Sequence, residues 1–105
     1  MISPALIEKV RAAVGDPHDQ CYVASEALYY LAGGKAAGLT PVNGVLETEY
    51  TRISHWWLRD ADGTVIDLTA EQFDFPWPYE DGRGRGFNCH KKARTVEIMA
   101  QVVLG

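Results

Sequence analysis

The stretch that decides the fold is ISHWWLRDADGTVIDL, residues 53–68. Its first six residues are rich in β-branched and aromatic side chains, residues 60–63 have the composition of a turn, and residues 64–68 favour a second strand. This order predicts a β-hairpin. If the loop comprises residues 61–63, with Gly63 in the left-handed conformation, Asp60 pairs with Thr64 and Trp57 pairs with Asp67.

That register places His55 and Asp67 on one sheet face as diagonal neighbours, roughly 7–8 Å apart between backbones. A two-residue loop, 62–63, would instead move Asp67 to the opposite face. Under the three-residue loop the other face is apolar and consists of Trp56, Leu58, Ile66 and Leu68. Because a buried carboxylate needs a partner, His55 is the natural partner of Asp67.

Helices are predicted on both sides of this hairpin. Ser3-Pro4 is typical of a helix start, and apolar residues follow at helical spacing until Gly15. A second helix is predicted from Cys21 to Leu31, stopped by glycines 33–34. A last helix is predicted over residues 91–104, and its apolar positions on one face are Val96, Met99, Ala100 and Val103.

The remaining segments are harder to assign. Residues 35–52 are ambiguous, with a short strand suggested by Val45 and Leu46. Thr69 could cap a short helical turn that ends at Phe73, whereas the prolines and glycines of residues 74–87 predict irregular structure. The sequence therefore predicts one α+β domain over residues 1–105, with helices packed on a small antiparallel sheet.

The bulk composition excludes several classes of protein. With 47% hydrophobic and 23% charged residues the chain is typical of a globular domain, and its net charge of −4 argues against a nucleic-acid partner. No apolar stretch is long enough to cross a bilayer, and no signal peptide is visible, so we expect a cytoplasmic protein without a membrane partner. Two cysteines are too few for a disulfide scaffold.

Three residues suggest a thiol enzyme. Cys21 lies at a predicted helix start, where free N–H groups and the helix dipole stabilise a thiolate. His55, held on the predicted strand, is the candidate base that moves the thiol proton, and Asp67 is the candidate that orients the imidazole. This chemistry needs no cofactor and no metal.

The order of these residues resembles the papain-like and transglutaminase-like superfamily. Its members have a cysteine at a helix start, a histidine on an aromatic strand and an aspartate on the returning strand. The resemblance covers residues 21–73, and the whole chain is also similar to small uncharacterised bacterial and phage proteins. It implies a minimal core of that fold and a cysteine hydrolase or acyltransferase that acts on an amide, isopeptide or glutamine side chain of a protein or peptide through a thioester.

Other residues have less certain roles. The backbone N–H of Cys21 could stabilise an oxyanion, with Gln20 or His18 as a second donor; papain-like peptidases instead carry a glutamine several residues before the cysteine. Trp57, Trp77, Tyr79 and Phe75 are candidates for a substrate groove. The glycine-rich run 82–86 lacks the residues of a phosphate loop and suggests a flexible flap.

Three alternatives stay open. Cys21 could be a small buried side chain beside a satisfied His55–Asp67 core pair. Cys21, His55, Cys89 and His90 are suitable zinc ligands, although no Cys-x-x-Cys pair is present. The chain could also be a non-catalytic protein-binding module that uses the aromatic loop 75–79, because 105 residues leave little room for a deep cleft. The same argument favours a homo-oligomeric site.

Overall fold

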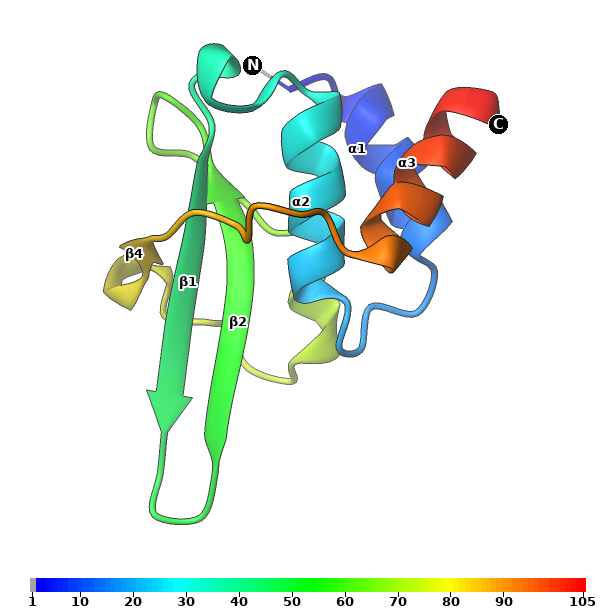
Figure 1. Cartoon of the computed structure of the whole chain (residues 1–105). Coiled ribbons are helices and arrows are strands. Elements are labelled where there is room, and N and C mark those ends of the chain that lie inside the picture. Colours follow the sequence, from blue (N-terminus) through cyan, green and yellow to red (C-terminus); the bar gives the residue numbers. More distant parts are fainter. Residues whose placement is uncertain (1) are drawn as a thin grey trace.

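The computed structural model describes residues 2–105 and shows an α+β domain (Figure 1). Its helices are α1 (Pro4–Val14), α2 (Cys21–Leu31) and α3 (Ala93–Leu104), with 3-10 helices η1 (Gly34–Ala37), η2 (Ala70–Gln72) and η3 (Tyr79–Asp81). Its strands are β1 (Thr40–Glu47), β2 (Arg52–Arg59), β3 (Val65–Ile66) and β4 (Arg83–Gly84). The predicted fold class is confirmed. The first two helices begin and end where the sequence predicts.

The strands form one antiparallel sheet in the order β3-β2-β1-β4. Leu58 of β2 lies opposite Ile66 of β3, and the N–H of Asp60 donates to the carbonyl of Thr64 at 3.0 Å. Gly63 has a φ of +84°, which is the left-handed conformation that a three-residue hairpin loop needs. The three-residue loop and its register are therefore confirmed.

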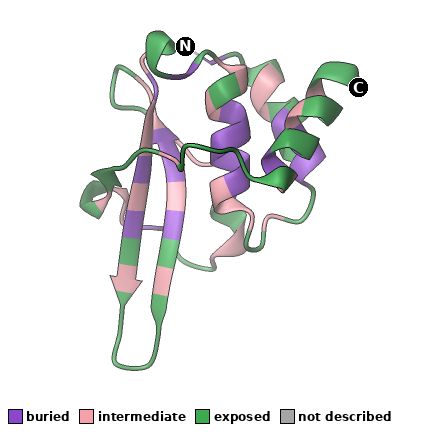
Figure 2. Cartoon of the chain, in the orientation of Figure 1, coloured by how far each residue is buried: buried purple, intermediate pink, exposed green. Residues whose placement is uncertain are grey.

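The main core lies between the sheet and the helices. Helix α2 packs against β2 on one side and against α1 and α3 on the other, so most of its surface is buried (Figures 1 and 2). Leu58 of β2 and Leu68, two residues after β3, are both buried in this core, and Ile66 of β3 packs against the same cluster. These are residues of the predicted apolar face, since the register places them together.

A second apolar cluster forms around Trp57 and is made of Val42, Trp57 and Trp77, with Tyr79 and Phe73 packed against it. Two glycines allow the indole of Trp57 to lie this close to the backbone. A Cβ on Gly44 would meet a ring carbon of Trp57 at 2.7 Å, and a Cβ on Gly82 would meet one at 2.2 Å. Small residues at these two positions are thus a condition for the second cluster.

Several predicted boundaries are wrong. Val45 and Leu46 do lie in a strand, but it is longer than suggested: residues 40–47 form β1, which pairs along its whole length with β2 and at Val42 and Asn43 with β4. Residues 74–87 are not wholly irregular, since they contain η3 and the two-residue strand β4. The second strand of the hairpin is reduced to β3, and the side chain of Thr69 does not cap η2.

Helix α3 begins at Ala93, two positions later than predicted, and its packed face differs from the predicted one. Thr95 and Ile98 are buried, whereas Val96 and Val103 are exposed. The reason is a polar contact across helices: the buried Glu26 of α2 accepts a hydrogen bond from Thr95 Oγ1 at 2.8 Å and another from the N–H of Lys92 at 3.2 Å. Glu26 thus caps α3 from outside that helix.

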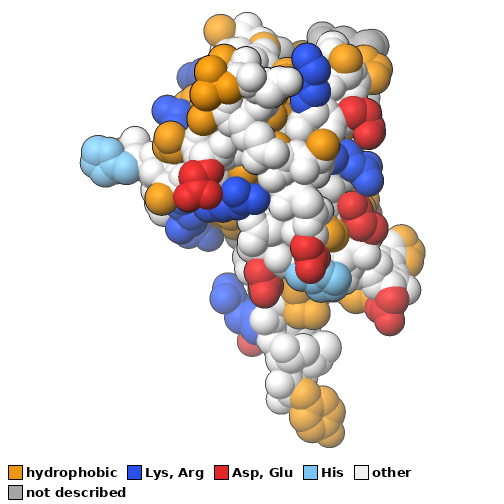
Figure 3. Space-filling view, turned by 90° about the vertical axis from the view of Figure 1, so that its right-hand side faces the viewer, with side chains coloured by type: hydrophobic (Ala, Val, Ile, Leu, Met, Phe, Trp, Pro, Cys, Tyr) orange, Lys and Arg blue, Asp and Glu red, His pale blue; other side chains and the backbone are white. Residues whose placement is uncertain are grey.

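The β1–β2 hairpin extends beyond the strands beside it. Strand β4 pairs only with Val42 and Asn43, and β3 pairs only with Leu58 and Arg59. The far end of the hairpin therefore projects from the body (Figures 1 and 3). Tyr50, between β1 and β2, is 89% exposed. Among residues 2–105, no helix is both long and apolar enough to cross a membrane.

Candidate active site

His55 and Asp67 form a short hydrogen bond inside the protein. His55 lies on β2 and Asp67 directly follows β3, and 2.6 Å separate Nε2 of the ring from Oδ2 of the carboxylate. The side chain of His55 is completely buried and that of Asp67 is 4% exposed. Because an ionised carboxylate only accepts, Nε2 carries a hydrogen, and a neutral ring therefore has its lone pair on Nδ1.

The same carboxylate has two further partners. The N–H of Thr69 donates to Oδ1 at 3.1 Å, and the hydroxyl of Tyr79 donates to Oδ2 at 2.7 Å. Asp67 is thus held by groups from three segments of the chain, which satisfies a buried charge. The contact of Tyr79 was not expected from the sequence, where this residue was a candidate for the groove wall.

Cys21 is the first residue of α2 and is partly exposed. No side chain among the described residues caps the start of α2, so the first N–H groups of the helix remain available to an anion. From Arg52 to Trp57 no strand of the described chain pairs with the outer edge of β2. The first turn of α2 lies beside this part of β2 (Figure 1). The Cys21 thiol there is one of the two groups that raise the pKa of His55.

The protonation of His55 reflects these neighbours. Burial by itself lowers the pKa of His55, but hydrogen bonds and charges from Asp67 and Cys21 outweigh burial and raise the pKa to about 9. Burial likewise raises the pKa of Asp67, and the contacts with His55, Tyr79 and Thr69 overcome this effect and lower it. At neutral pH the pair is therefore an imidazolium and a carboxylate.

Nδ1 is the ring nitrogen left for the thiol, because Nε2 is bonded to Asp67. Within residues 2–105, Nδ1 is buried and makes no hydrogen bond of regular geometry. Cys21 raises the pKa of the ring, although Nδ1 has no hydrogen-bond partner among residues 2–105. Apo sites often have such loose contacts between nucleophile and base.

Aromatic rings enclose the imidazole on the side of the second cluster. The ring centroids of Phe73, Trp77 and Trp57 lie 4.8, 4.9 and 5.5 Å from that of His55. These rings exclude water from the His55–Asp67 bond, and this strengthens the electrostatic interaction between the two groups. Phe73 was not among the predicted site residues, because the sequence showed no reason to place it beside His55.

The predicted groove residues lie mainly inside the protein. Trp57 and Trp77 are buried in the second cluster, since the glycines at 44 and 82 let backbone close over them. Of the aromatic residues in the loop 75–79, only Phe75 is exposed, at 38%, whereas Trp77 is 5% exposed. The aromatic side chains of this loop therefore stabilise the site from within more than they form an outer contact surface.

The two candidates for a second oxyanion donor lie near Cys21 in sequence. His18 is exposed and its Nδ1 pairs with Asp16 Oδ1 at 2.7 Å, so one nitrogen of its ring is already engaged at the surface. Gln20 is the N-cap residue of α2, and its amide oxygen is buried without a hydrogen-bond partner among residues 2–105. Of the two, Gln20 is the one adjacent to the thiol.

The zinc alternative has little geometric support. Cys89 is exposed, whereas His55 is buried, and Asp67 occupies one nitrogen of its ring. In the part of the chain that the structure describes, no three His, Cys, Asp or Glu side chains are grouped so that they could hold a metal ion.

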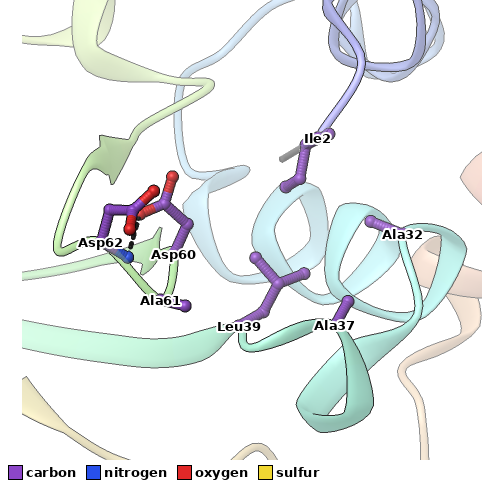
Figure 4. A pocket seen from close by; sticks show the side chains of 7 residues that line it. All are labelled: Ile2, Ala32, Ala37, Leu39, Asp60, Ala61 and Asp62. Carbon is purple, nitrogen blue, oxygen red and sulfur yellow. Dashed lines mark hydrogen bonds between the residues drawn. The ribbon is translucent and has the colours of Figure 1, made fainter.

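One pocket lies at the other end of α2. It is bordered by Ile2, Ala32, Ala37, Leu39, Asp60, Ala61 and Asp62 (Figure 4). Since α2 has 11 residues, this end is roughly 16 Å from Cys21. Asp60 accepts a hydrogen bond from the N–H of Asp62 there, which shapes the hairpin loop. The pocket is thus separate from the thiol site.

Comparisons of this chain with known protein families, curated proteins and solved structures give no match.

Proposed function

We propose that this protein is a cysteine hydrolase or acyltransferase that acts on an amide, isopeptide or glutamine side chain. One observation carries the proposal: a buried histidine is hydrogen-bonded to a buried aspartate, and a partly exposed cysteine at a helix start helps to raise the pKa of that histidine. This arrangement is the one that a thiol nucleophile, its base and an orienting carboxylate require. The resemblance to the papain-like and transglutaminase-like superfamily agrees with it.

The reaction follows from the protonation of the pair. The thiol of Cys21 gives its proton to Nδ1 of His55, and its sulfur attacks the carbonyl carbon. A C–S bond forms and the carbonyl electrons move to oxygen, beside the free N–H groups at the start of α2. The tetrahedral intermediate collapses, the C–N bond breaks, and His55 gives its Nδ1 proton to the departing amine. A thioester on Cys21 results.

The second half of the reaction regenerates the thiolate. Neutral His55 removes a proton at Nδ1 from water or from an acceptor amine, which attacks the thioester carbon. The C–S bond then breaks and its electron pair returns to sulfur. Asp67 keeps the hydrogen of His55 on Nε2 during both halves, so that Nδ1 always faces the reacting groups.

The substrate and the compartment belong to the same proposal. A protein or peptide is the expected substrate, because its amide bonds and side chains offer the required carbonyl. Both cysteines are free thiols, and Cys89 is exposed. This fits a reducing compartment such as the cytoplasm, where an exposed thiol stays reduced.

Alkylation with iodoacetamide tests the site without a known substrate. Cys89 is more exposed than Cys21, so access alone predicts that Cys89 reacts faster. A neighbouring histidine that takes up the thiol proton reverses this order, and we expect Cys21 to react at least about tenfold faster than Cys89 at pH 6. Peptide mass spectrometry measures both rates.

A pair of histidine variants supplies the control. His55→Ala should remove the advantage of Cys21, whereas His18→Ala, which changes an exposed ring three residues from the cysteine, should leave it intact. Incubation with p-nitrophenyl acetate should then place an acetyl group on Cys21 that hydroxylamine removes. Equal, slow alkylation of both cysteines, or the same rates in His55→Ala, would contradict the proposal.

A further inference from the structure

The hydroxyl of Tyr79 and the ring of His55 share one oxygen of Asp67. Oδ2 accepts from Nε2 of His55 at 2.6 Å and from the Tyr79 hydroxyl at 2.7 Å, while Oδ1 accepts from Thr69. Both bonds to Oδ2 are short, as expected for donors to an ionised, buried acceptor. Any change in one of them therefore alters the charge that the other donor meets.

The structure fixes Tyr79 at both its backbone and its ring. Its N–H donates to the carbonyl of Trp77 at 2.9 Å, and its own carbonyl accepts from the N–H of Gly82 at 3.1 Å. Its ring meets that of Trp57 edge to face, with 5.1 Å between centroids. The hydroxyl thus reaches Asp67 from a well-held position, which reduces the entropy cost of the hydrogen bond.

Tyr79 can act only as a donor at this place. The carboxylate of Asp67 has no hydrogen to give, so the phenol must keep its own. Burial and the contact with Asp67 raise the pKa of Tyr79, so the hydroxyl remains protonated wherever His55 titrates. The titratable groups that act directly on His55 are Asp67 and Cys21, and Tyr79 acts through Asp67.

We propose that Tyr79 is a positioning residue of this site: its hydroxyl holds the carboxylate of Asp67 against His55 and withdraws charge from the shared oxygen. The proton affinity of His55 is lower as a result, so that the ring releases its proton to a leaving amine more readily. The catalytic meaning of this role rests on the proposed function. The effect of Tyr79 on the proton affinity of His55 does not depend on the proposed function.

The test measures the titration of the His55 ring by NMR in a Cys21→Ala background, where the thiol cannot contribute. Tyr79→Phe keeps the ring on Trp57 and removes only the hydroxyl. The shared oxygen then carries more charge, and we expect the pKa of His55 to rise by about half a unit, a threefold change in proton affinity. Tyr50→Phe, at the exposed hairpin tip, is the matched control and should change nothing.

A second measurement has the opposite sign and keeps the native side-chain shape. Replacing all tyrosines by 3-fluorotyrosine makes the phenol a stronger donor, so the pKa of His55 should fall. The fall should be absent when the same replacement is made in Tyr79→Phe. An unchanged or lowered pKa of His55 in a folded Tyr79→Phe variant, or no fall with fluorotyrosine, would overturn the proposal.

The alkylation experiment separates this proposal from the proposed function. If Cys21 reacts no faster than Cys89 while the His55 titration shifts in both directions as described, Tyr79 tunes the ring and the enzyme proposal fails. If Cys21 reacts faster than Cys89 and the titration of His55 does not respond to Tyr79, the enzyme proposal stands and the role of Tyr79 fails. In an active site, Tyr79→Phe should also shift the alkaline limb of the Cys21 alkylation profile to higher pH by the same half unit, about threefold in proton affinity.

Discussion

The hydrogen bond between His55 and Asp67 makes the stability of this protein fall as the pH rises. The pKa of His55 is about 9 in the folded chain and near 6.5 in the unfolded chain. A group whose pKa is raised by folding stabilises the protein fully below its unfolded pKa, and loses this contribution as the pH rises through its folded pKa. The affected window therefore lies between about pH 6.5 and pH 9.

The size of the effect follows from the shift. A difference of 2.5 units between 9 and 6.5, at 1.36 kcal/mol for each unit, corresponds to about 3 kcal/mol in the free energy of unfolding. The ring is fully buried, so solvent does not screen its contact with Asp67. Urea unfolding followed by tryptophan fluorescence at pH 6, 7, 8 and 9.5 measures the loss.

Two variants test the cause. Asp67→Asn keeps the shape of the side chain and removes its charge, so only Cys21 then opposes the effect of burial and the pKa of His55 falls. The fall in stability between pH 6.5 and pH 9 should become much smaller. The exposed pair formed by His18 and Asp16 is the matched control, and Asp16→Asn should leave the slope almost unchanged.

The same measurement refutes the reasoning if the sign is different. A wild-type stability that is flat or rises from pH 6.5 to pH 9 would mean that His55 is not held as an imidazolium. An equal slope in Asp67→Asn would mean that other groups cause the dependence. At the acid end the sign reverses: the lowered pKa of Asp67 gives a contribution that is present above about pH 4 and lost as the pH falls further.

Two substitutions probe the packing that surrounds the site. In Gly82→Ala the new methyl would meet the ring of Trp57 at 2.2 Å, so we expect a loss of about 1–3 kcal/mol in urea unfolding, whereas Gly86→Ala, with open space around it, should change stability by less than about 0.5 kcal/mol. Thr95→Val removes a donor from the buried Glu26 and should lower the free energy of unfolding by about 1–3 kcal/mol. Equal losses of stability in the two glycine variants, or no loss in Thr95→Val, would contradict these assignments.

Local signals explain why much of the fold could be predicted. Ser3 and Pro4 set the start of α1, and Gly63 set the loop length of the hairpin and thereby its register. The register in turn determines that His55 and Asp67 share a face. Each of these steps depends on residues close together in the sequence, where turn and capping preferences act.

Contacts between distant segments could not be predicted in the same way. Tyr79 reaches Asp67 only because the segment after η2 folds back across the sheet, and this path depends on Gly82 lying against Trp57. Glu26 has no visible reason to be buried until the start of α3 supplies its donors. In both cases a polar side chain is satisfied by a group far along the chain, which composition and periodicity do not reveal.

Because the β1–β2 hairpin extends beyond β3 and β4, the backbone amides of β2 differ in their protection from hydrogen exchange. The N–H groups of Asp60 and Leu58 point toward the segment 64–66, which pairs with them. Every second N–H of a strand points to the same side, so the N–H of Ser54 also points that way, but no strand among residues 2–105 lies beside it there. Deuterium should thus enter rapidly at Ser54 and slowly at Leu58. His55 lies at the border between these two parts of β2, next to the amide that should exchange rapidly.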